Sequence, residues 1–184
     1  MIDERNDTMK TTGVVRRIDD LGRIVIPKEI RKSLRIKDGE SLEICLDSDN
    51  IVLKKYSELN NLGDFYKNYV DSINSFIKEN IIIVDRNSIV AIAGDLKKKY
   101  IGKNITKDID DIIQKRNMII EKEFKEISLV TNIFENGSYI ISPIIVNGDA
   151  IGAVIMLSTT RSLDDFDVKT MAIASKFLGK YIEE

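Results

Sequence analysis

The stretch TGVVRRIDDLGRIVIPKEIRKSL, residues 12–34, decides the fold of the first part of this 184-residue chain. β-Branched side chains dominate residues 12–18 and residues 23–26, and the turn-forming sequence at residues 19–22 separates them. Such residues favour extended backbone because their side chains pack well on a pleated surface. The stretch therefore predicts a β-hairpin.

A short helix and a second hairpin are predicted to follow. Pro27 suits the first turn of a helix, and Ile30 and Leu34 repeat at the i, i+4 spacing of one helix face. Apolar and polar side chains then alternate over residues 42–46, and residues 51–56 complete the hairpin after a polar turn. The element order is ββαββ.

This ββαββ unit is small enough to need help from a partner. It spans fewer than 50 residues, and its single cysteine, Cys45, cannot close an intramolecular disulfide. A unit of this size has only a marginal core of its own, so we expect it to oligomerise. Cys45 falls on the opposite strand face from Leu42, Ile44 and Leu46, and it is either a structural thiol or a redox switch; with no basic neighbour to activate it, the structural role is favoured.

The positive charge of the chain is concentrated in this unit. Although the whole chain carries a formal charge of −2, residues 10–37 hold nine basic and three acidic residues, a local charge of +6. The basic residues are Lys10, Arg16, Arg17, Arg23, Lys28, Arg31, Lys32, Arg35 and Lys37. Clustered lysine and arginine side chains are what phosphate binding requires, although an unevenly charged solvated surface explains the same pattern.

Composition excludes several classes of protein. The chain has no histidine, so histidine-dependent catalysis is excluded and a zinc site is not expected. No stretch approaches the roughly 20 apolar residues of a membrane span, and the charged start does not look like a signal peptide. We therefore expect a cytoplasmic protein without metal, cofactor or enzymatic activity.

Residues 57–80 predict a helix with an apolar seam. Six apolar residues recur at alternating spacings of three and four: Leu59, Leu62, Tyr66, Tyr69, Ile73 and Phe76. This is the a/d pattern of helices that pair with other helices. One hypothesis is that the seam joins two dimers into a dimer of dimers, and the alternative is that the helix only covers its own sheet.

Residues 81–184 predict a second domain of mixed structure. Strand patterns occur around residues 81–94 and in three segments between 127 and 158, separated by a polar, helix-compatible region over 96–126. A final helix is predicted with Ser162 as its N-cap. Its apolar face comprises Phe166, Ile173, Phe177, Leu178 and Tyr181. The fold class is α+β, an antiparallel sheet sandwiched by helices.

The segment from Met9 to Tyr56 closely resembles the AbrB-type swapped-hairpin domain, above all in LGRIVIPKEIR, residues 21–31. In that family two chains exchange hairpins and close one β-barrel, and arginines on one face of the dimer contact DNA. Carried over position by position, the resemblance implies contacts from Arg16, Arg23, Arg31 and Lys32. Lys32 stands where the family has arginine, so it keeps a phosphate contact but lacks the fork for bidentate base reading. Pairing of Arg23 with Asp19 or Asp20 is the structural alternative. The polar residues 1–8 precede the resemblance and are expected to be dispensable.

Residues 81–184 resemble GAF sensor domains in IIIVDRNSIVAIAG, in KKKYIGKNI and in SPIIVNGDAIGAVIMLS. Together the two halves are similar to a family of regulators from spore-forming bacteria. That resemblance implies a protein that binds double-stranded DNA, activates and represses late sporulation genes in the developing spore, and either senses an unidentified small molecule or uses its second domain only for assembly.

Two other functions compete with this interpretation. The first domain also suits an antitoxin that neutralises a partner protein, but such antitoxins usually carry a disordered tail where residues 81–184 predict a folded domain. Some GAF-like domains catalyse redox reactions through cysteines, and the second domain has none.

Overall fold

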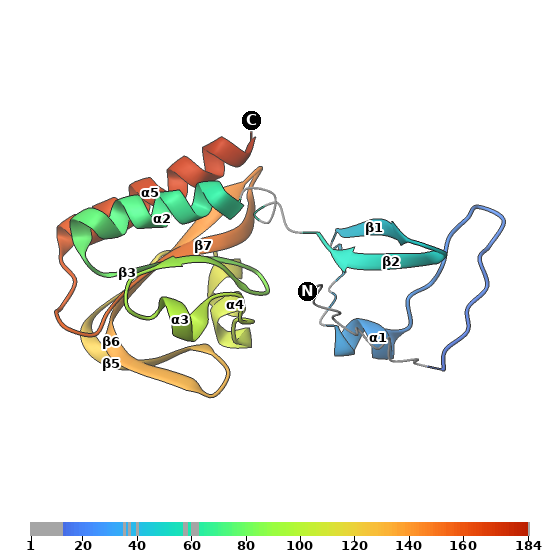
Figure 1. Cartoon of the computed structure of the whole chain (residues 1–184), viewed down its shortest axis with the longest axis horizontal. Helices are drawn as coiled ribbons and strands as arrows, with labels where there is room; N and C mark the ends of the chain where they lie inside the picture. The colour runs from blue at the N-terminus through green and yellow to red at the C-terminus, as the bar shows by residue number, and fades with distance from the viewer. Residues whose placement is uncertain are drawn as a thin grey trace, which may run out of the picture. The chain divides into compact units, whose positions relative to one another are not determined.

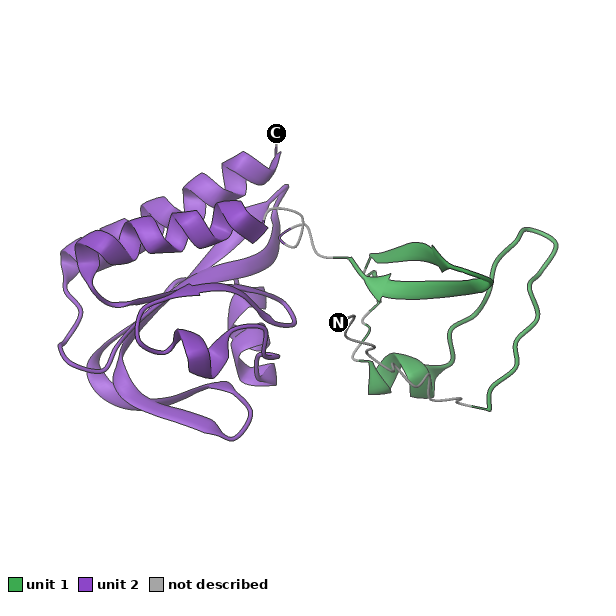
Figure 2. Ribbon diagram, in the orientation of Figure 1, with its two compact units in different colours: residues 1–56 green, residues 57–184 purple. Residues whose placement is uncertain are grey.

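The computed structural model describes residues 13–34, 36, 38–39, 41–56, 59 and 63–183. The chain divides into two compact units, residues 1–56 and residues 57–184 (Figure 2). The predicted boundary at residue 56 coincides with this division. Of the positions that the sequence singled out, Lys10, Arg35, Lys37, Leu62 and the segment 1–8 lie outside the described residues.

Unit 1, residues 1–56, contains the predicted short helix and the second predicted hairpin. Helix α1 covers Lys28–Ser33 and begins after Pro27. Strands β1, Leu42–Asp47, and β2, Asn50–Lys55, pair antiparallel, with Leu42 opposite Lys55. The alternation in the sequence is sufficient to predict this hairpin, because its two strands are adjacent in the chain and a tight turn brings them together.

The first predicted hairpin is wrong for the single chain. Residues 13–27 form a long open loop without strand pairing (Figure 1). Only its turn is present, where the Gly22 N–H donates to the Asp19 carbonyl at 3.0 Å and the Asp19 N–H to the Arg23 carbonyl at 3.1 Å. Gly22 has a φ of +75°, which glycine adopts without strain. The flanking apolar side chains have little to pack against in one chain; Val15, for example, is 86% exposed.

Unit 2, residues 57–184, is built on one five-stranded sheet. The strands are β3 Asn80–Asp85, β4 Ile89–Ala93, β5 Ile119–Val130, β6 Ile133–Val146 and β7 Asp149–Ser158. Their order is β4-β3-β7-β6-β5, and every neighbouring pair is antiparallel. The α+β antiparallel fold predicted from the sequence is confirmed for this unit.

Helices cover both faces of this sheet. Helices α2, Gly63–Ile77, and α5, Asp165–Glu183, lie side by side on one face, and α3, Lys97–Tyr100, and α4, Lys107–Gln114, cover the other (Figure 1). Each face has its own apolar core. Tyr66, Val70, Met171 and Leu178 belong to the first core, while Tyr100 belongs to the second.

Two details of unit 2 differ from the predictions. The helix-compatible region ends at Gln114, and residues 119–126 belong to β5, because pairing with β6 provides backbone partners that a polar sequence does not reveal. Helix α5 is capped by Asp164 rather than Ser162. The Asp164 carboxylate accepts from the Asp167 N–H at 3.1 Å, and the Asp167 carboxylate accepts from the Asp164 N–H at 2.9 Å, a reciprocal capping box.

None of the helices within the described residues is long and apolar enough to cross a membrane.

Candidate nucleic-acid interface

The loop of residues 13–27 carries two of the four predicted contact residues. Arg16 lies on its first arm and is exposed, and Arg23 lies on the second arm, just after the turn. The turn is closed by the Asp19 carboxylate, which accepts from the N–H groups of Leu21 at 3.1 Å and Arg23 at 2.7 Å. The loop therefore presents one arginine on each side of a hydrogen-bonded turn.

Arg23 pairs with an acid on its own turn, as the structural alternative proposed. Its Nε donates to Asp19 Oδ2 at 2.7 Å. The backbone and side-chain hydrogen bonds from Arg23 lower the pKa of Asp19 below its usual value. The Arg23 side chain nevertheless stays 70% exposed, and exposed ion pairs contribute little to stability. A phosphate group can therefore still approach Arg23.

The other two predicted residues are adjacent on α1. Arg31 donates from Nη1 to Asp38 Oδ1 at 2.7 Å, and its side chain is partly exposed. Lys32 is exposed. Among the described residues, Arg16 and Lys32 make no ion pair, while Arg23 and Arg31 each have one. Of the four cations, Arg16 and Lys32 are thus the ones most available to an incoming anion.

The β1–β2 hairpin of the same unit exposes an apolar face. Ile44 and Leu46 on β1 alternate with more polar residues, and Ile51 and Leu53 lie across from them on β2. All four are exposed, and Leu46 reaches 81%. Cys45, on the other face, is half-buried with Val52 as its cross-strand neighbour, which agrees with a structural thiol. A face of this kind is typical of a surface that another chain covers.

The seam residues predicted over residues 57–80 divide into core and surface, and Leu59 lies before helix α2, which begins at Gly63. Leu59 and Tyr66 are completely buried in the core of their own unit. Tyr69 and Ile73 are half-buried, and Phe76 is 89% exposed. The first two are therefore core residues, as the alternative interpretation of this helix expects, and only the later part of the seam remains accessible.

An aromatic stack joins α2 to α5 at this surface. The rings of Phe65 and Tyr181 stack at 4.5 Å between centroids, and those of Tyr69 and Phe177 at 5.6 Å. Of the apolar face predicted for the last helix, Leu178 is buried in the core beside Met171 and Ala174, whereas Phe177 and Tyr181 stay exposed at its edge. Phe65 and Tyr69 on α2 have the i, i+4 spacing, as do Phe177 and Tyr181 on α5, and this spacing was a signal for aromatic faces on both helices. It could not show that the two helices meet.

Known proteins match nearly the whole length of the chain. The family model for the C-terminal part of stage V sporulation protein T, described as a transcription factor, matches residues 61–183. Stage V sporulation protein T of Bacillus subtilis is 42% identical over 178 residues, which cover 96% of this chain and 100% of that protein. The chain belongs to the stage V sporulation protein T family. The sporulation family that the sequence resembled is thereby confirmed.

The N-terminal unit has relatives of its own. The transition state regulatory protein AbrB of Bacillus subtilis is 54% identical over 48 residues, which cover 26% of this chain and 50% of AbrB. The family model of the antitoxin MazE, described as antidote-toxin recognition, matches residues 15–59. The resemblance of unit 1 to the AbrB type is therefore confirmed.

Solved structures show the fold of unit 2. The GAF domain/HD domain protein from Geobacter sulfurreducens aligns with a TM-score of 0.52 and 15% identity over 70% of this chain and 96% of that one. A methyl-accepting chemotaxis protein fragment aligns with a TM-score of 0.53 and 20% identity over 66% and 88%. At these identities the likeness concerns the fold alone, and it shows that unit 2 has a GAF-like fold.

Proposed function

We propose that this protein is a DNA-binding transcriptional regulator of late sporulation genes, able to activate some and repress others. The observation that carries the proposal is identity along nearly the whole chain to a stage V sporulation protein T. It is supported by exposed cations at the four positions for which the resemblance to the AbrB type implies DNA contacts. On this proposal the protein acts by binding and assembly, without turnover of a substrate.

The DNA-contacting surface is proposed to be Arg16, Arg23, Arg31 and Lys32. All four are at least partly exposed, and the turn closed by Asp19 holds Arg23 in place. Phosphate contacts from such side chains supply affinity and fix the register, while the planar fork of an arginine also suits bidentate contacts to a base edge. Lys32 is therefore assigned a phosphate contact and the arginines are the candidates for base contacts.

A dimer of unit 1 is proposed because one chain leaves its apolar side chains uncovered. Val15 and Val25 in the loop, and Ile44 and Leu46 on β1, are all exposed in the single chain. Burying each such side chain contributes about 1.5 to 3 kcal/mol, so a few of them suffice to hold two chains together. An exchange of the 13–27 loops between chains, as in the swapped-hairpin family, would also give this backbone the strand partners it lacks.

A second interface is proposed on the α2–α5 surface of unit 2. Phe76 on α2 and Ile173 on α5 are strongly exposed, and the same two helices carry the stacked rings of Phe65, Tyr69 and Phe177. Association through this surface would join two dimers. This surface replaces the full seam predicted from the sequence, since Leu59 and Tyr66 are buried in the core of their own unit.

The GAF-like unit is further proposed to bind a small molecule that modulates DNA binding. Its support is the fold alone, because the structural neighbours share the GAF-like architecture at low sequence identity. The antitoxin function remains the competing candidate for unit 1, since the antitoxin model matches residues 15–59. Recovery of a bound small toxin with the intact chain would favour that candidate.

The test is the salt dependence of DNA binding by the full chain. Four cations in two copies offer up to eight phosphate contacts, so affinity should fall by roughly three to five powers of ten between about 50 and 200 mM salt. Arg23→Ala should weaken binding to every sequence and flatten the log–log salt slope by about 2, because a dimer loses two contacts.

Lys67→Ala is the matched control, since Lys67 is an exposed cation on α2 in the other unit. It should leave both affinity and slope unchanged. Arg23→Ala should also leave the thermal unfolding temperature nearly unchanged, because the side chain is exposed and removes no core volume. An unchanged slope in Arg23→Ala would show that the DNA-facing surface has been misassigned.

A further inference from the structure

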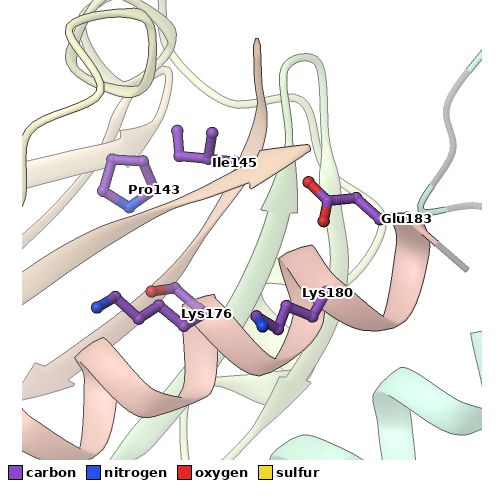
Figure 3. Close-up of a pocket in the computed structure, with 6 residues that line it drawn as sticks. Pro143, Ile145, Lys176, Lys180 and Glu183 are labelled. Carbon is purple, nitrogen blue, oxygen red and sulfur yellow. The ribbon is translucent and has the colours of Figure 1, made fainter. Parts of the chain in front are cut away.

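Unit 2 contains a pocket between strand β6 and helix α5. Its volume is about 320 Å³, at the lower end of the range of sites for small molecules. Pro143 and Ile145 line it from β6, and Ser175, Lys176, Lys180 and Glu183 line it from α5. Figure 3 shows the lysines and Glu183 along the helix, across from Pro143 and Ile145 on the strand.

Close backbone contact holds the two walls of this pocket in place. Gly179 packs so tightly that an added Cβ would lie 2.4 Å from the Ile145 carbonyl oxygen. The Ser142 and Ser175 hydroxyl groups are buried and lie 2.7 Å apart. The strand itself is irregular here, with a register shift between Ile144 and Ile145. The pocket is therefore preformed, and a ligand need not order its walls.

The charges in the pocket are not balanced by the protein. Lys176 and Lys180 lie one helical turn apart, where like charges repel each other. Neither lysine forms an ion pair in the part of the chain that the structure describes. Glu183, which could have paired with Lys180, instead accepts a hydrogen bond from the Asn147 N–H at 3.0 Å. Two cations thus share one side of a small pocket whose single carboxylate is turned toward the β6–β7 turn.

We propose that this pocket binds a small organic anion. Its carboxylate or phosphate group would lie between Lys176 and Lys180, and its body would pack on Pro143 and Ile145. The carboxylate of Glu183 at the far end would repel a second anionic group and accept a hydrogen bond from a ligand hydroxyl. The ligand class is therefore an organic molecule with one anionic group and a hydroxyl, either a hydroxycarboxylate or a hydroxylated phosphate monoester.

This inference rests on the proposed function, in which a small molecule modulates DNA binding. It adds the position of the binding site and the chemical class of that molecule. A ligand held by Lys176, Lys180 and Ile145 ties α5 to β6. Phe177 lies on the same helix, and its ring stacks on Tyr69 of α2. Occupancy would therefore stabilise the helix pair that carries the proposed second interface.

The experiment is a ligand-dependent thermal unfolding series on the full chain. The probes are 2-hydroxybutyrate, for the carboxylate source, and glycerol 3-phosphate, for the phosphate source, each compared with sodium chloride at equal ionic strength. A ligand that binds only the folded state raises the free energy of unfolding by RT ln(1 + L/Kd), where L is the free ligand concentration, and the unfolding temperature rises accordingly. At least one probe should raise it with half-saturation below about 10 mM, and the effective probe identifies the source.

Variants decide whether the pocket is responsible. Lys176→Gln with Lys180→Gln should raise the half-saturating concentration at least tenfold, while Lys169→Gln, an exposed lysine on α5 outside the pocket, should not change it. Glutamine preserves helix propensity, and circular dichroism checks that the fold is retained. The inference is overturned if neither probe exceeds sodium chloride, or if the double variant responds like the parent chain. Because DNA binding is measured separately, a failure here with DNA binding intact leaves the proposed regulator function standing.

Discussion

The connection between β7 and α5 is held by a charged cluster whose removal has a calculable effect. The Arg161 guanidinium donates to Asp167 through both terminal nitrogens, at 2.7 and 2.9 Å, and its Nε lies 2.9 Å from Glu79. The Asp167 side chain is only 2% exposed, whereas that of Arg161 is 40% exposed. The cluster joins the start of β3 to the first turn of α5.

Asp167→Asn tests how much this cluster contributes. Breaking a buried ion pair costs about 3 to 5 kcal/mol, but the partly exposed Arg161 regains water and asparagine can still accept from the Asp164 N–H. We therefore expect a loss of about 2 to 3 kcal/mol in the free energy of unfolding at neutral pH. For a domain of this size that lowers the unfolding temperature by roughly 6 to 12 °C.

The stability lost in Asp167→Asn should depend on pH in a definite direction. Burial alone would raise the pKa of Asp167, but the hydrogen bonds from Arg161 and from the Asp164 N–H outweigh it, so the pKa lies below its usual value. A carboxyl whose pKa is lowered by folding contributes stability above its unfolded pKa and loses it as the pH falls. The difference between the parent chain and Asp167→Asn should thus be complete at pH 7 and shrink below about pH 4.

Urea unfolding followed by circular dichroism, at one protein concentration, measures the difference. Asp165→Asn is the control, because Asp165 lies two residues earlier on the same helix and pairs with Lys122 at 2.6 Å while its side chain is 86% exposed. It should cost no more than about 1 kcal/mol. Equal losses in the two variants at pH 7, or a difference that does not shrink in acid, would refute this account of the cluster.

Three further predictions concern assembly and the chain's start. Phe76→Glu should reduce the full chain from a dimer of dimers to a dimer in analytical ultracentrifugation, because it places a charge in the proposed second interface, where Phe76 is 89% exposed in one chain. Asn68→Glu, at an exposed position of the same helix, is the control and should leave the assembly unchanged. Leu46→Glu places a charge on the exposed apolar face of β1 and should shift unit 1 toward monomer and weaken DNA binding at low protein concentration in a titration read by fluorescence anisotropy. Deletion of residues 1–8 should leave DNA affinity unchanged, and a measurable loss would show that the segment contributes.

Local patterns in the sequence were enough to predict the elements whose partners are close in the chain. The β1–β2 hairpin and helix α1 follow from alternation and from Pro27. The capping box is also visible in the sequence as Asp164 and Asp167 at the spacing of three, although the sequence pattern favoured Ser162 as the N-cap. Sequence alone could not separate them because both are good N-cap residues.

Elements that depend on distant or external partners were harder to predict. Residues 119–126 are polar enough for a solvated helix, and only their pairing with β6 makes them a strand. The loop of residues 13–27 has strand-forming side chains but finds no strand partner within the described part of its own chain. In both cases the sequence states a preference, and the available backbone partner decides the outcome.

The candidate DNA residues show the same division. Charge clustering pointed to a segment whose cations are exposed, and the structure contains the i, i+4 pairing of Asp19 with Arg23 that the sequence offered as an alternative. The pairing of Arg31 with Asp38 was not, because the two residues meet only through the backbone path after α1. Exposure, which decides whether a cation can reach a phosphate, is a property of the folded chain and could not be predicted from composition.

The exposed apolar residues of unit 1 link its folding to its proposed function. If Val15, Leu46 and their neighbours are buried only between two chains, the stability of the unit depends on protein concentration. The same association doubles the cations presented to DNA, since each chain contributes Arg16, Arg23, Arg31 and Lys32. DNA would then bind the associated state and stabilise it, so that dimerisation and DNA binding form one coupled equilibrium. A second interface on unit 2 would keep two such pairs together and raise the local concentration of unit 1 without any further contact to DNA.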